Sequence, residues 1–102
     1  MPTYVLLSTL TADGRRTVKE RPQRIKQVTK EVEQFGAKVL SQYALLGPYD
    51  FITVIDAPDN ETAAHLSLDL GSRGTINITT LPAMPVQQLV KKLGGPKQMG
   101  KK

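Results

Sequence analysis

The clearest candidates for chemistry lie in a four-residue turn, Gly47-Pro48-Tyr49-Asp50, that precedes an apolar segment. A phenol next to a carboxylate could donate and accept protons if the site excluded water and shifted both pKa values. The alternative is structural: Asp50 accepts hydrogen bonds from backbone N–H groups of the turn, while Tyr49 packs its ring and leaves its hydroxyl outward. We favour the structural interpretation. The chemical one predicts a polar rim on an apolar cavity, made by Tyr49 and Asp50 with Tyr43 and Arg24 nearby.

Three basic side chains form a second group of candidates. Lys19, Arg21 and Arg24 lie before and within the first turns of a predicted helix, where they could hold an anionic substrate or the carboxylates of a partner. At about 100° per residue, Arg21 falls within the apolar stripe of that helix and Arg24 falls at its margin. These two arginines are therefore the better candidates, and Lys19 is expected on a solvated face.

Polar side chains also alternate along the predicted strands, as they would in the wall of a small-molecule cavity. Threonine is equally common in strands for its β-propensity alone, and both explanations stay open. The residues are Thr9, Thr11, Tyr43, Thr53, Asn77 and Thr79.

Composition excludes several classes of site. The chain has no cysteine and one histidine, which removes disulfides and thiolate chemistry and argues against a zinc or iron site made by protein ligands. His65 lies away from the apolar stripe of its predicted helix, so we expect a surface imidazole and no catalytic role. No metal site and no cofactor are predicted.

The chain of 102 residues is long enough for one domain with one modest core. Its net charge of +5 divides unevenly. Residues 1–37 carry seven basic and four acidic groups, residues 38–85 carry two and five, and residues 86–102 carry five and none. The excess lies in a tail without aromatic residues, so we expect a single domain over 1–93, a basic flexible tail over 94–102, and no binding to nucleic acid.

The sequence predicts a cytoplasmic protein that does not cross a membrane. No apolar run approaches the roughly 18 residues that a membrane span needs. The N-terminus also lacks the pattern of a secretory signal.

Hydrophobic periodicity predicts the order of the elements. After a first strand, Asp13 and Gly14 indicate a turn. Apolar residues then recur at helical spacing, between Pro22 at a first helical position and Gly36 after the last turn. Asp59 is expected to cap the second helix, and Pro82 to end the fourth strand. The predicted strands are 3–11, 38–46, 51–56 and 75–81, and the predicted helices are 22–35, 59–71 and 86–93.

This order, β-α-β-β-α-β with a short C-terminal helix, predicts an α+β fold of the ferredoxin-like type: a four-stranded antiparallel sheet with both main helices on one face. The first and third predicted strands are apolar on both sides, so the helices leave one apolar face bare. Such a surface usually marks an interface. We therefore expect a homodimer or larger oligomer whose open sheet faces meet around a small cavity.

Several stretches together resemble the GYD-domain family of small bacterial and archaeal proteins. They are "YVLLSTLT", "VKERPQR", "LGPYDFITVIDAPDNETAA" and "TTLPAM", in that order over most of residues 3–84. Pro48 splits the namesake Gly-Tyr-Asp element. The resemblance implies a ferredoxin-like fold of the dimeric α+β barrel type, and it implies no assigned activity.

Three functions fit these observations. The first is a homo-oligomer that binds a small molecule in a sensing or carrier role, with Tyr43, Tyr49, Asp50, Arg21, Arg24, Thr9, Asn77 and Thr79 as candidate ligand-binding residues. The second is a cofactor-independent enzyme, an oxygenase or isomerase, by analogy of fold alone. The third is a protein-interaction module that uses the basic tail or the edge of the second predicted helix.

Overall fold

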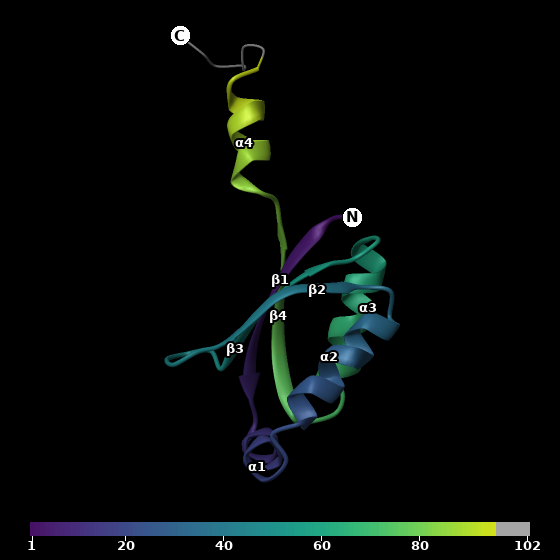
Figure 1. The fold of residues 1–102 in the computed structure, drawn as a ribbon, viewed down its shortest axis with the longest axis vertical. Coiled ribbons are helices and arrows are strands. Elements are labelled where there is room, and N and C mark those ends of the chain that lie inside the picture. Colours follow the sequence, from purple (N-terminus) through teal and green to yellow (C-terminus); the bar gives the residue numbers. More distant parts are fainter. Residues whose placement is uncertain (96–102) are drawn as a thin grey trace.

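The computed structural model describes residues 1–95, which form one antiparallel sheet with two helices packed on one side of it (Figure 1). Most of the tail predicted over 94–102, namely residues 96–102, lies outside the described residues. The sheet has four strands in the order β2-β3-β1-β4, which confirms the α+β class and the antiparallel pairing. The strands are β1 (Thr3–Leu10), β2 (Lys38–Ala44), β3 (Phe51–Asp56) and β4 (Ile76–Ala83), and the helices are α1 (Ala12–Glu20), α2 (Arg24–Gln34), α3 (Asn60–Gly71) and α4 (Val86–Leu93).

Helix α1 corrects the sequence analysis, which expects only a turn after the first strand. Thr11 caps this helix, because its hydroxyl accepts the Gly14 N–H at 3.1 Å, and Asp13 lies near the positive end of the helix dipole. Asp and Gly are turn formers, but they also suit the first turn of a helix when the backbone is capped. The helix predicted from Pro22 begins at Arg24.

Strand β4 continues through Pro82, so the prediction that this proline ends the strand is wrong. β4 lies at an edge of the sheet and pairs only with β1, with Pro82 opposite Tyr4. A proline is tolerated on an edge strand, where its missing N–H need not belong to the ladder.

The core lies between the sheet and the two helices α2 and α3, which Figure 1 shows on the same side of the strands. Leu6 and Ile55 from the sheet are buried with Val32 of α2 and with Leu66 and Leu70 of α3. The period of four in Leu66 and Leu70 places both side chains on one face of their helix. This packing fixes both helices against the strands.

The predicted cap of α3 is confirmed. Asp59 accepts the Thr62 N–H at 2.8 Å, and its backbone is extended, as at other helix N-caps. Hydrogen bonds from Thr62 hold the pKa of Asp59 below its ordinary value. The cap therefore stabilises the fold above the pKa of the unfolded carboxyl, and this contribution is lost as the pH falls through the folded pKa.

The opposite face of the sheet, which we call the open face, is covered by no helix of residues 1–95 (Figure 1). Side chains alternate along strands, so the residues between the buried ones point to this face. The register places Leu7 of β1 beside Ile52 of β3, and Val5 beside Val54 and Leu81. All of these side chains keep part of their surface exposed.

Strand β2 carries an irregularity of register between Val39 and Ser41, as a β-bulge produces. Like β4, it lies at an edge of the sheet. Within residues 1–95, no helix has the length and apolar character required to cross a membrane.

Candidate functional site

A cavity of about 420 Å³ lies between the helix-covered face of the sheet and the ends of α1, α2 and α3. Its wall is mainly apolar and comes from every one of these elements. The apolar lining residues include Leu10, Ile25, Val28, Phe51, Ile76 and Ile78. A volume of this size is typical of small-molecule sites.

The sheet supplies polar groups to this cavity. Thr53 and Ser8 are both buried, and both line the cavity. Thr53 accepts a hydrogen bond at 3.1 Å from the side-chain amide of Gln42 on β2. The Ser8 hydroxyl makes no hydrogen bond among the described residues. Every fully enclosed side-chain polar atom among these residues has a hydrogen-bond partner, so the Ser8 oxygen is not fully enclosed. The Ser8 oxygen therefore keeps access to the cavity.

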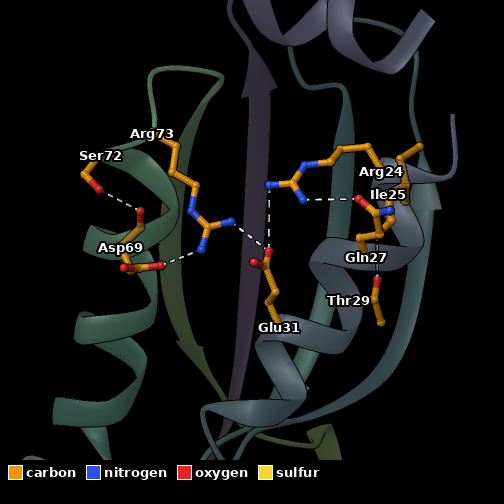
Figure 2. A network of polar contacts seen from close by, with 8 residues as sticks. All are labelled: Arg24, Ile25, Gln27, Thr29, Glu31, Asp69, Ser72 and Arg73. Atoms are coloured by element: carbon orange, nitrogen blue, oxygen red, sulfur yellow. Dashed lines mark hydrogen bonds and ion pairs between the residues drawn. The ribbon is translucent and has the colours of Figure 1, made fainter. Parts of the chain in front are cut away.

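Three arginines, Arg21, Arg24 and Arg73, line the same cavity, and we call them the arginine rim. Arg73 follows α3 and donates to Glu31 of α2 at 2.7 Å and to Asp69 of α3 at 2.8 Å. Figure 2 shows Glu31 between the guanidinium groups of Arg73 and Arg24. The Glu31 hydrogen bond raises the pKa of Arg73 above its ordinary value. The charged side chains thus tie α2 to the end of α3.

Arg24 and Arg21 are held less firmly than Arg73. The contact between Arg24 and Glu31 measures 3.9 Å, well beyond the 2.7–2.9 Å of a charge-assisted hydrogen bond. Arg24 also donates to Gln27 at 3.3 Å. Arg21 makes no side-chain hydrogen bond or ion pair with the described residues.

The structure brings together some of the candidate residues and separates others. Arg21, Arg24 and Thr53 line the cavity. The register places Tyr43 opposite Ile52 and therefore on the open face. Thr9, Asn77 and Thr79 belong to the same open face. Tyr49 and Asp50 are not part of the cavity wall, so the four members of the hypothetical rim do not meet around this cavity.

Sequence reasoning missed Ser8, Gln42 and Arg73. The only signal for Arg73 is that it is one of two basic residues in a stretch rich in acidic ones. Ser8 and Gln42 are ordinary strand positions until the register is known. His65 is exposed as expected, and its ring packs edge-on against Phe35, with the centroids 5.1 Å apart.

Asp50 joins the β2–β3 loop to β1. Its carboxylate accepts the Leu10 N–H at 2.7 Å, and its own N–H donates to the Ser8 carbonyl at 2.8 Å. Its carbonyl accepts the Leu45 N–H at 2.8 Å. The carboxylate therefore serves the backbone of a strand 40 residues away, which supports the structural interpretation of this residue.

Asp50→Ala is expected to lower the free energy of unfolding by about 1.5 to 3 kcal/mol, because a part-buried N–H loses a charged acceptor. Asp50→Asn keeps an acceptor without the charge, so its loss should be smaller. Urea denaturation of both variants measures the difference. If Asp50→Ala unfolds at the same urea concentration as the unmodified chain, the carboxylate has no structural role.

Helix α4 presents a second candidate surface. Figure 1 shows it standing beyond the end of the sheet, and none of its residues is buried. Val86, Leu89, Val90 and Leu93 are all exposed and follow the spacing i, i+3, i+4, i+7. This spacing gives the helix one apolar face, which the described residues leave uncovered.

One family model and one curated relative match most of the chain. The model of the family described as "GYD domain" matches residues 4–93, and this range includes α4. The chain is 50% identical over 94 residues to the "Glutamine synthetase and cystathionine beta-lyase binding protein" of Thermus thermophilus. That match covers 91% of this chain and 99% of the relative.

One solved structure supports the fold. The crystal structure of TTHA0845, a protein of Thermus thermophilus, matches with a TM-score of 0.52 and 21% sequence identity. The match covers 83% of this chain and 95% of that one. At this identity the likeness concerns the fold alone.

Proposed function

This chain belongs to the GYD domain family, and from that premise we propose that it is a protein-interaction module whose partner is a metabolic enzyme. The observation that carries the proposal is the identity of 50%, over nearly the full length of both chains, with a relative named for binding glutamine synthetase and cystathionine beta-lyase. We propose these two enzymes as the first partners to test. The proposal replaces small-molecule binding as the principal function.

Helix α4 is the element proposed to bind the enzyme. An exposed helix with an i, i+3, i+4, i+7 apolar face matches the mode in which an amphipathic helix occupies an apolar groove of its partner. Lys91 and Lys92 in its last turn would add contacts to acidic groups at the margin of such a groove. Leu89 lies in the middle of the apolar face and serves as the test position.

Leu89→Ser is expected to weaken binding to a purified glutamine synthetase or cystathionine beta-lyase from the same source by about tenfold or more, because it removes a side chain whose burial contributes about 1.5–3 kcal/mol. Gln88→Ser, its neighbour on the polar face, should bind as the unmodified chain does. Isothermal titration calorimetry of the three proteins measures the difference.

The melting temperatures of both variants should stay close to that of the unmodified chain, since α4 has no buried residue. Absence of binding to either enzyme by the unmodified chain would remove these partners. Equal binding by Leu89→Ser and Gln88→Ser would remove α4 as the contact element.

The open face is proposed to meet a second copy of the chain, as in a dimeric α+β barrel. Val5, Leu7 and Ile52 form an apolar surface on the two central strands, and the helices lie on the opposite side of the sheet. Contiguous apolar patches of this kind mark interfaces. A two-fold pairing of identical faces would cover them and leave α4 available to the enzyme.

A further inference from the structure

We propose that the cavity beneath α2 and α3 binds a small amphipathic carboxylate, whose apolar part occupies the cavity and whose charged group lies at the arginine rim. This site differs from both surfaces proposed above. It lies on the helix-covered side of the sheet, whereas self-association uses the open face and enzyme binding uses α4. The proposal therefore does not rest on either of them.

The cavity has the size and lining that an apolar ligand needs. Its volume of about 420 Å³ lies within the 300–1,000 Å³ typical of small-molecule sites. Side chains such as Val28, Phe51 and Ile78 form its wall from α2, β3 and β4. An apolar chain or ring of about ten carbon atoms would contact several elements at once and leave little apolar wall exposed to water.

The hydroxyl group of Ser8 indicates where a polar atom of a ligand, or an ordered water, could bind within the cavity. The Ser8 residue is 5% exposed and lines the cavity. Its hydroxyl makes no hydrogen bond among the described residues. No fully enclosed side-chain polar atom among the described residues lacks a partner, so the Ser8 oxygen is open to the cavity, where a polar atom of a ligand can supply its hydrogen bond. Thr53, by contrast, already accepts from Gln42.

The arginine rim supplies the charge. Arg21, Arg24 and Arg73 carry three positive charges, while Glu31 and Asp69 carry two negative ones, which leaves one positive charge in excess. Arg73 is engaged by both carboxylates at 2.7 and 2.8 Å. Arg24 is held only by a 3.3 Å hydrogen bond to Gln27 and a 3.9 Å contact with Glu31, and Arg21 has no side-chain partner among the described residues, so these two are the groups proposed to bind a ligand. A guanidinium binds a carboxylate through two parallel hydrogen bonds, so one carboxylate matches the charge in excess.

The test uses the ¹⁵N-labelled full chain with decanoate as the probe and 1-decanol as its uncharged counterpart. Decanoate is expected to cause saturable shifts in the backbone amide signals of Ser8, Thr53 and Leu70, which line the cavity. The double variant Arg21→Gln/Arg24→Gln should weaken decanoate at least tenfold and leave 1-decanol binding unchanged.

Arg16→Gln provides the matched control, because Arg16 is exposed, pairs with Asp13 and is not part of the cavity wall. It should bind decanoate as the unmodified chain does. The proposal is overturned if decanoate causes no saturable shifts, or if the shifts appear only at open-face residues such as Val5, Leu7 and Ile52. An equal loss of affinity in Arg16→Gln, which would indicate a response to net charge alone, also overturns it.

Discussion

Gly14→Ala is expected to lower the free energy of unfolding by about 3 kcal/mol, the upper end of the usual cost of overpacking. A Cβ at this position would lie 1.9 Å from the Thr75 carbonyl oxygen and 3.2 Å from Cδ2 of Leu10. The obstructing atom is backbone, and it accepts the Thr11 N–H at 3.0 Å, so it cannot move without loss of that bond. The melting temperature should fall by about 10 °C or more.

Gly71→Ala is the matched control for this prediction. Gly71 ends α3, has no neighbouring atom within 4 Å of the position that a methyl group would take, and needs no left-handed backbone. Alanine there should be neutral or should stabilise the fold by about 0.4 to 1 kcal/mol. Calorimetric scans of the two variants, made side by side, decide the point. Equal melting temperatures would mean that Gly14 does not lie as close to the Thr75 carbonyl as the structure places it.

Leu7→Lys is expected to dissociate the proposed open-face dimer into monomers. Leu7 lies on a central strand of the open face, beside Ile52. A lysine at the centre of a face-to-face contact would place a charge in an apolar interface without a partner, which costs several kcal/mol per ion. Sedimentation equilibrium should give about twice the 11.2 kDa chain mass for the unmodified protein and one chain mass for the variant.

Leu68→Lys makes the same substitution on the outer surface of α3, where the leucine is 74% exposed. It should leave the dimer intact. If Leu68→Lys dissociates the protein and Leu7→Lys does not, the contact lies on α3, which the sequence also offers as an interaction surface. A single chain mass for the unmodified protein would remove the open-face dimer.

Local patterns in the sequence predicted most of the fold. The strand at 51–56 and the helix at 86–93 have the predicted bounds, and Asp59 caps α3 as expected. Helix α1 is absent from the sequence prediction because Asp13 and Gly14 favour turns as well as a capped first turn, and the close approach of Gly14 to Thr75 is a long-range feature that no local pattern indicates. The prediction for Pro82 is wrong because a proline can lie within a strand at the edge of a sheet, and β4 is such an edge strand. The order of the strands depends on the whole sheet, so local sequence does not reveal it.

The candidate cavity was less predictable than the fold. Arg21 and Arg24 both line the cavity. Helical periodicity could not place Arg21, because this exposed residue ends α1 and the next helix begins only at Arg24. It could not show that Arg73 reaches the same place from the end of α3, 42 residues from its partner Glu31. Thr53 lies on the helix-covered face of the sheet, and Thr9 and Thr79 lie on the open face. Strand alternation alone could not predict this, because a shift of the strand register by one residue moves every side chain to the opposite face.

The two edge strands also determine how far association can proceed. A bare strand edge can recruit another chain without limit and give filaments, since each added strand exposes a new edge. Here β4 carries Pro82, which has no N–H to offer, and β2 is distorted by its bulge between Val39 and Ser41 and begins with Lys38. Both edges are therefore poor templates for strand addition. The proposed contacts through the open face and through α4 use neither edge, and a two-fold contact between identical open faces closes on itself instead of extending into a fibre.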